Sequence, residues 1–166
     1  MTPLPEQAAA RRLKAALEKE MAFLPEIEAF LGEALRALEE AAPARIPVQA
    51  AAVGAAVSDA YLLVENVLKA IARTFEGMPE GPDWHAELLE AAALDIPEVR
   101  PPVVRGHTRA LLEELRRFRH VVRNVYGMRL DARRAREIAA AAPVAIAAFR
   151  EDIEAFRRFL DALCTA

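Results

Sequence analysis

The residue types best suited to chemistry are concentrated in one short stretch, Phe118–Tyr126, which directly precedes Gly127. Polar groups packed this densely into about two helical turns are costly to keep near a core, so they call for a bound ligand, a partner or a polar network. The net charge of −3 gives the chain as a whole no attraction to a polyanion, which would have to be held by a local arginine cluster. This stretch supplies such a cluster, with polar neighbours: Arg119, His120, Arg123, Asn124 and Tyr126.

The helix that carries this stretch is predicted to run from about Val103 to Tyr126. At about 100° per residue, its apolar side chains form one arc that must face a core: Leu111, Leu115, Phe118, Val122 and Val125. The polar side chains form a continuous strip beside that arc: Arg116, Arg119, His120, Arg123, Asn124 and Tyr126. Because like charges four residues apart on this strip repel each other, we expect a negatively charged group beside it.

Two long helical segments are predicted before this one, from apolar residues spaced by three and four. The first covers about residues 13–38, and Pro25 either kinks it or divides it into two helices. The second runs from Pro47 to Glu76, because Pro47 suits the first helical position and Gly77 suits the position after the end.

A short third helix and a long last helix complete the predicted set. Asp83 can cap the short helix, which covers Trp84–Leu94, and Asp131 can cap the last one. The chain is therefore predicted to be a single all-α domain over residues 1–166. Its expected architecture is an up-and-down helical bundle of four long helices plus a short helix.

Composition restricts the setting and the chemistry further. The single cysteine, Cys164, can form no disulfide within the chain, which favours a reducing, cytoplasmic location. No uninterrupted apolar run reaches the roughly 18 residues of a membrane span, so no membrane association is expected. The three histidines have no mutual spacing suited to a metal, and we predict neither a metal site nor a cofactor.

The polar strip resembles the signature of the HepT-like members of the HEPN superfamily. That signature is an arginine, a polar residue, three further positions, a histidine, any residue and a tyrosine, and Arg119, His120 and Tyr126 fall on it. The resemblance extends to residues 61–66, to residues 81–89 and to residues 100–102, in the order that such proteins show. Together these stretches extend the resemblance over well over half of the chain.

The resemblance implies a homodimer in which two motifs face a shared cleft, and metal-independent cleavage of RNA. In that chemistry a polar group helps the ribose 2′-hydroxyl attack the adjacent phosphate, while arginine stabilises the charge that gathers on phosphorus. Arg119 is the expected transition-state residue and His120 a positioning or proton-transfer group. Arg116 and Arg123, on the same strip, are the expected RNA-binding residues. We expect Arg119→Ala to abolish cleavage and to leave the fold intact.

One departure from the signature concerns the position of the catalytic histidine, which is occupied by Asn124. An asparagine side chain cannot transfer a proton at neutral pH. Three alternatives follow: His120 takes over the role, Asn124 orients RNA, or this branch has lost nuclease activity. The third alternative predicts a non-catalytic subunit that binds substrate for a nucleotidyltransferase.

The resemblance also implies a partner and a modification. Related proteins are nucleotidylated on the tyrosine of the signature by a minimal nucleotidyltransferase, which acts as the antitoxin of a toxin–antitoxin pair. An AMP group on Tyr126 would place negative charge beside Arg119 and Arg123 and block the cleft. Modification of Tyr126 is therefore the expected means of inactivation.

Structural explanations exist for the same residues. Arg119 and Arg123 could pair with acidic residues of a neighbouring helix, and Glu65 is the carboxylate expected to pair with an arginine of the strip. His85, beside Trp84, is interpreted as an anchoring residue at the start of the short helix. His107 is interpreted as an exposed residue near the start of the next one.

Overall fold

Helices form all the regular elements in the part of the chain that the structure, a computed structural model, describes, residues 5–165. The α-helices are α1 (Pro5–Met21), α2 (Leu24–Glu39), α3 (Ile46–Phe75), α4 (Trp84–Ala92), α5 (Gly106–Asn124) and α6 (Ala132–Thr165). Short 3-10 turns precede two of them: η1 (Pro43–Arg45) and η2 (Gly127–Arg129). Over these residues extended pairing is limited to one isolated bridge, so the predicted all-α fold is confirmed.

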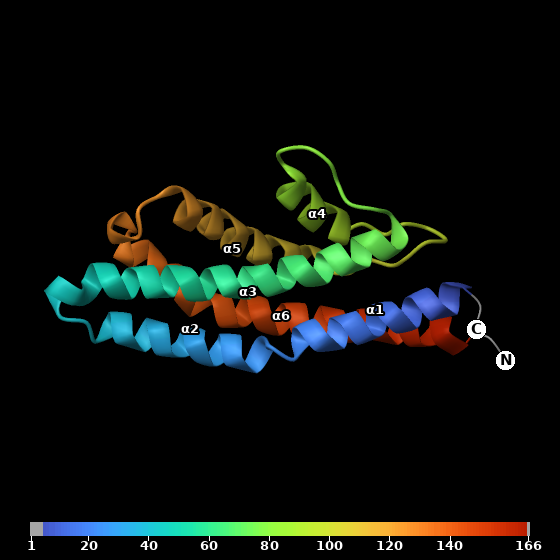
Figure 1. Cartoon of the computed structure of the whole chain (residues 1–166), viewed down its shortest axis with the longest axis horizontal. Coiled ribbons are helices and arrows are strands. Elements are labelled where there is room, and N and C mark those ends of the chain that lie inside the picture. Colours follow the sequence, from blue (N-terminus) through green and yellow to red (C-terminus); the bar gives the residue numbers. More distant parts are fainter. Residues whose placement is uncertain (1–4, 166) are drawn as a thin grey trace.

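The first predicted segment is divided into two helices. α1 ends at Met21, and α2 begins at Leu24 with Pro25 in its first turn, where a missing backbone donor costs nothing. Figure 1 shows α1 and α2 lying nearly end to end alongside α3 and α6. The pair therefore acts as one long element of the bundle. The α1–α2 pair, α3, α5 and α6 are the four long helical elements that were predicted, and α4 is the short helix.

The central element of the bundle is α3. It packs against α1, α2, α4, α5 and α6, and buried side chains recur along its whole length. It ends as predicted: Gly77 has a φ of 85°, which favours glycine, and the amides of Glu76 and Gly77 both donate to the carbonyl of Ala72. By length and composition alone, the helical segment Pro43–Phe75 could also cross a membrane. The central position of α3 in this core accounts for that composition.

The predicted helix cap is present at the start of α6 and absent at the start of α4. Asp131 Oδ1 accepts hydrogen bonds from the amides of Arg133 at 2.9 Å and Arg134 at 3.3 Å, so the predicted cap is confirmed. The side chain of Asp83 makes no such bond; its backbone carbonyl accepts the amides of Ala86 and Glu87 instead.

α5 ends at Asn124, two residues earlier than predicted. Val125 is extended, with φ −122° and ψ 153°, and is 40% exposed, so its predicted place in the core arc is wrong. The cause is the close approach of the next turn to α3, where a Cβ on Gly127 would lie 3.3 Å from the Cβ of Ala51. The chain must leave the helix to make that approach. Leu115 and Phe118 are buried as predicted.

Candidate functional site

A buried carboxylate on α3 organises the site. Glu65 is only 3% exposed, and its Oε2 accepts hydrogen bonds from Arg119 Nη1 at 2.7 Å and from His85 Nδ1 at 2.6 Å. Lys69, one turn further along α3, places its Nζ 3.4 Å from the other carboxylate oxygen. Three helices therefore meet at one side chain. The predicted pairing of Glu65 with an arginine of the strip is confirmed.

The surroundings of Glu65 keep it ionised. Burial alone would raise the pKa of this carboxyl group, because a charge loses hydration there. The hydrogen bonds from Arg119 and His85, together with the positive charge of Arg119, outweigh that effect and hold the pKa of Glu65 below its ordinary value. The site thus contains a fixed negative charge whose partners are held in place by it.

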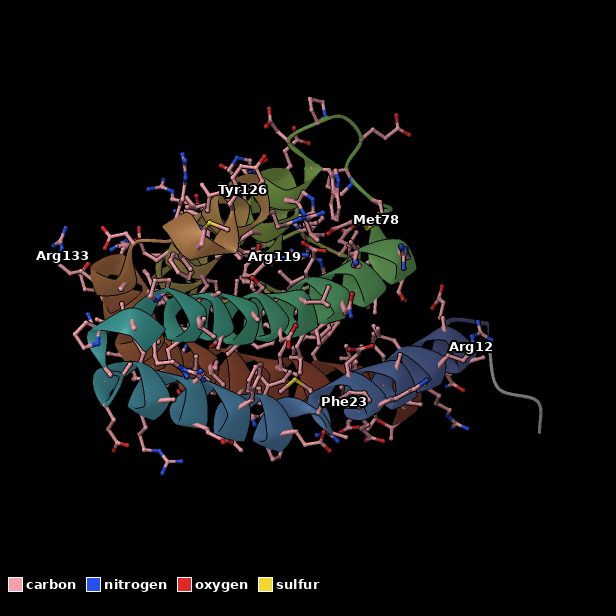
Figure 2. The ribbon with its side chains drawn as sticks, turned by 60° about the vertical axis from the view of Figure 1, so that its left-hand side comes forward. Arg12, Phe23, Met78, Arg119, Tyr126 and Arg133 are labelled. Atoms are coloured by element: carbon pink, nitrogen blue, oxygen red, sulfur yellow. The ribbon has the colours of Figure 1, made fainter. Side chains whose placement is uncertain are left out.

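Arg119 is fixed from two sides. Besides its bond to Glu65, the guanidinium carbon lies 5.7 Å from the centre of the Tyr61 ring, a distance suited to a cation–π contact. Figure 2 shows Arg119 between α5 and α3, whereas Tyr126 lies on the outer side of the molecule. Burial raises the pKa of Tyr61, so its ring acts as a neutral wall of the site.

His85 belongs to the site, which sequence analysis did not predict. Its ring stacks on that of Trp84, with centroids 3.5 Å apart, and Lys69 Nζ lies 5.8 Å from the Trp84 ring. The interpretation of His85 as only an anchor of the short helix therefore missed its contact with Glu65. The available signal was its place in residues 81–89, a stretch that resembles the family. His107 is exposed, as expected.

The position of α4, and hence of His85, depends on a buried arginine outside the site. Arg100 donates to the Glu76 carboxylate at 2.6 Å and to the carbonyls of Ala91 at 3.0 Å and Leu94 at 3.1 Å. The Ala91 carbonyl belongs to the last turn of α4, and the Leu94 carbonyl lies two residues beyond the end of that helix. Arg100 thus ties the end of α4 to the end of α3.

An open cavity of about 280 Å³ is lined by two of the partners of Glu65, Arg119 and His85. Its lining contains five of the predicted site residues together with the additional histidine: His85, Arg116, Arg119, His120, Arg123 and Asn124. Three guanidinium groups and two imidazoles thus face one small space. Such a lining favours an anionic ligand, and phosphate groups in particular match the geometry of arginine.

The cations of the cavity differ in how far they are neutralised. Arg116 donates two hydrogen bonds to the Glu113 carboxylate, at 2.7 and 2.8 Å, and these bonds raise the pKa of Arg116. Glu113 is thus a negatively charged group of the kind expected beside the strip. By contrast, within residues 5–165 neither Arg123 nor His120 pairs with an acidic side chain. The cavity therefore keeps a positive charge available at Arg123.

Asn124 and Tyr126 occupy different positions relative to the cavity. The side-chain amide of Asn124 donates through Nδ2 to the His120 carbonyl at 2.6 Å, at the C-terminal end of α5. Asn124 also borders the cavity. Tyr126 lies beyond the helix end, is 77% exposed and does not line the cavity. The predicted place of Tyr126 on the helical strip is wrong, because α5 ends before it.

Metal ligands do not gather in this region. Across residues 5–165, no group of three or more His, Cys, Asp or Glu side chains is arranged to hold a metal ion. Glu65 and His85 form a pair whose nearest additional partners are the cations Arg119 and Lys69. Cations in these positions would repel a metal ion.

The part of the sequence that forms the strip on α5 and its partners on α3 and α4 matches a known family. The family model described as HepT-like protein matches residues 52–160, which include every residue of the cavity. The chain belongs to the HepT-like family. Neither the curated proteins nor the solved structures contain a significant match to it. Membership in this HEPN-related family confirms the resemblance and indicates a function related to HEPN-type toxins.

Proposed function

We propose that this HepT-like protein is an endoribonuclease that cleaves RNA without a metal ion, with the cavity between α4 and α5 as its active site. The observation that carries the proposal is the lining of that cavity, in which Arg119 is fixed by Glu65 beside two histidines. Family membership supports the same reaction class, since HEPN-like proteins are commonly RNases.

The cationic lining suits a phosphodiester. A guanidinium group has five N–H donors, and the Glu65 bond occupies one on Arg119, through Nη1. The remaining donors can stabilise charge on the phosphate oxygens in the transition state. Arg123 adds a cation with no acidic partner in the described chain, and Arg116 borders the same space. These two residues are the proposed RNA-binding groups.

The proposed reaction is attack of a ribose 2′-oxygen on the adjacent phosphorus. The new bond joins O2′ to phosphorus, and the bond from phosphorus to O5′ breaks. The products are one RNA with a 2′,3′-cyclic phosphate and one with a 5′-hydroxyl group. The protein must supply a group that removes the 2′-hydroxyl proton and a cation that stabilises the phosphorane-like charge. Arg119 is suited to the second task.

A second function is favoured by one specific observation. The residue at the position of the catalytic histidine, Asn124, uses its amide to bond the His120 carbonyl and can transfer no proton. A chain with this substitution could act instead as a non-catalytic subunit that binds a substrate for a nucleotidyltransferase. The same cavity would then bind a phosphate group without cleaving it.

We further propose a homodimer and a minimal nucleotidyltransferase as partners. Apolar side chains stay exposed beside the cavity, at Val121 (46%) and Met128 (76%) as well as at Val125. A second copy placed over them would bring two cavities to one cleft. Tyr126 projects from the same region and is accessible to a modifying enzyme. Its nucleotidylation would add negative charge next to the cavity.

The deciding experiment measures cleavage of a mixture of tRNA and mRNA in EDTA by the protein expressed without a partner. We expect cleavage with 2′,3′-cyclic phosphate ends. Arg119→Lys should reduce it at least tenfold, because lysine preserves a charge beside Glu65 but not the planar fork of donors. Arg73 is an exposed arginine in the last turn of α3, outside the cavity. Arg73→Ala is the matched control and should cleave RNA as the wild type does.

One result would decide against the nuclease, and another against the cavity as its active site. Absence of cleavage by folded, unmodified wild type would favour the nucleotidyltransferase subunit, as would RNA binding without products. Equal cleavage by wild type and Arg119→Lys would show that the cavity is not the active site. A stable complex with a minimal nucleotidyltransferase, detected by size-exclusion chromatography, would support the partner proposal under either function.

A further inference from the structure

His85 is held in the cavity by more contacts than the other histidine there. Its Nδ1 lies 2.6 Å from Glu65 Oε2, and its ring stacks on Trp84 at an interplanar angle of 27°. The helix that carries it is tied down by Arg100. His120, which lines the same cavity from α5, is exposed, and within the described chain its imidazole has no hydrogen-bond partner. Only His85 is therefore oriented in advance.

The contact with Glu65 determines which nitrogen of His85 can accept a proton. An ionised carboxylate only accepts hydrogen bonds, so Nδ1 must be the protonated nitrogen. In the neutral ring Nε2 then carries a free electron pair. A carboxylate in this position also stabilises the imidazolium form once Nε2 has taken a proton. The pair Glu65–His85 therefore has the composition and geometry of an oriented general base.

The cavity lining places this base beside the phosphate-binding cations. His85 borders the cavity together with Arg119 and Arg123, and the oxygen that orients His85 is the same one that fixes Arg119. One carboxylate thus sets the position of both the proposed base and the proposed transition-state cation. Asn124, which stands at the signature's histidine position, has no proton-accepting nitrogen.

We propose that His85 is the general base of this protein and replaces the histidine that the signature lacks at position 124. The inference rests on the proposed nuclease function. Nε2 of His85 takes the proton of the ribose 2′-hydroxyl as O2′ bonds to phosphorus. The bond from phosphorus to O5′ then breaks, and the departing oxygen takes a proton from water. His85 afterwards releases its proton to the solvent, so the enzyme returns to its starting state.

Charged and titratable groups around His85 must be considered when the pH dependence of cleavage is measured. Glu65 and Lys69 face it from α3, Asp83 precedes it by two residues, and α5 presents five more groups: Arg116, Arg117, Arg119, His120 and Arg123. His120 is the other histidine among these groups. A pH profile must therefore be compared between variants at both histidines.

The test compares wild type with His85→Gln, His120→Gln and His107→Gln in the cleavage assay. Glutamine can still donate a hydrogen bond to Glu65, so the fold should be kept, and unfolding curves will check this. His85→Gln should lower kcat about 100-fold or more with little change in KM, as expected for loss of a general base. The pH profile of His85→Gln should differ from that of the wild type. His107, outside the cavity, is the matched control and should behave as wild type.

A second variant separates catalysis from structure. His85→Ala leaves space at the ring position, and added imidazole should restore part of its activity but none of that lost in Arg119→Lys. Cleavage by a folded His85→Gln protein at the wild-type rate and with the wild-type pH profile would overturn the base assignment and leave the nuclease function standing. Absence of cleavage by wild type would overturn both.

Discussion

Arg119 and Glu65, 54 residues apart in the sequence, are joined by a hydrogen bond of 2.7 Å in which both side chains are largely removed from solvent. This relationship alters one expectation from the sequence. Arg119 borders a cavity, but it also compensates a buried negative charge. Truncating it leaves that charge with His85 and Lys69 alone, so Arg119→Ala is not expected to leave stability unchanged.

We predict that Arg119→Ala lowers the free energy of unfolding by about 3 kcal/mol, the lower end for breaking a buried ion pair. Glu65→Ala should have a similar cost, because it leaves Arg119 without its partner. The double variant should lose less than the sum of the two, since the interaction is removed only once. Urea unfolding followed by circular dichroism provides all three values. Additive losses would show that the two side chains are not energetically coupled.

The stability contributed by Glu65 should depend on pH in a definite direction. Its pKa is lowered in the folded protein from an ordinary value of 4.5, so folding favours the ionised form. The contribution is therefore fully present above pH 4.5 and is lost as the pH falls through the folded-state pKa. We expect the stability difference between wild type and Glu65→Gln to shrink over the interval in which the pH falls below about 4.5.

Denaturant unfolding at several pH values will measure that difference. A difference that stays constant over the same interval would contradict the prediction. Glu113→Gln is a useful comparison because the pKa of Glu113 is also lowered, chiefly by its hydrogen bond with Arg116, but at a more exposed position. Its effect should have the same sign and a smaller size, owing to solvent screening.

The two members of the Glu65–Arg119 pair were predictable from sequence for a local reason. Each lies on a long helix whose apolar period fixes which way its polar residues point. His85 was not predictable in this way, because the position of α4 depends on the turn after Gly77 and on the contacts of Arg100. Neither feature is encoded in a periodic pattern.

The end of α5 was mispredicted for a related reason. Val125 continues the apolar period of the helix, and nothing in that period reveals that the next turn approaches α3. Periodicity describes a helix until a tertiary contact overrides it. The two residues that were placed wrongly, Val125 and Tyr126, lie after the end of α5. The residues of the strip up to Asn124 line one cavity, as their spacing suggested.

Phe118 provides a test of how α5 is oriented toward the core. Its side chain is 3% exposed, so Phe118→Ala should lower the free energy of unfolding by about 3–5 kcal/mol through lost burial and a residual cavity. Val121 lies on the same helix and is 46% exposed. Val121→Ala is the matched control and should change stability by less than about 0.5 kcal/mol. Thermal and urea unfolding will compare them, and similar losses would mean that the helix is rotated differently.

At Gly54, α3 packs tightly against α5 and against the residue that follows η2. A Cβ at this position would lie 2.9 Å from Leu130 Cδ2 and 3.2 Å from Val122 Cγ2, so Gly54→Ala requires both side chains to shift. We expect a loss of about 1–3 kcal/mol, as for overpacking of a core. At Gly32, inside α2, no neighbouring side chain lies within 4 Å of the position that a Cβ would take, and Gly32→Ala should stabilise the protein by about 0.5–1 kcal/mol.

These two glycine variants should therefore shift the unfolding midpoint in opposite directions. The comparison is informative because both positions are helical and the mutation is the same. A stabilising effect of Gly54→Ala would show that α5 and the following turn can move away from α3 without cost. Such freedom would leave the cavity, which α5 lines, less well defined than the structure indicates.

Arg100 tests whether the site depends on an anchor outside the cavity. Its buried guanidinium joins the end of α3, through Glu76, to the last carbonyls of α4. Arg100→Met should retain much of the packing volume but remove the hydrogen bonds that Arg100 donates to those carbonyls and to Glu76. We expect amide hydrogen exchange in α4 to accelerate while amides of α3 and α6 remain protected. The fluorescence of Trp84, the single tryptophan of the chain, should change with it.

The consequence for the site follows from the stacking of His85 on Trp84. If α4 loosens, His85 loses its fixed position over Glu65 although no residue of the cavity has been altered, and cleavage should fall through kcat. Arg150→Ala is the matched control, because Arg150 also pairs with a glutamate, Glu28, but at the exposed surface, where such pairs contribute about 0–1 kcal/mol. Unchanged exchange in α4 of Arg100→Met would show that the packing of Leu88 and Leu89, both buried, is enough to hold the helix and its histidine in place.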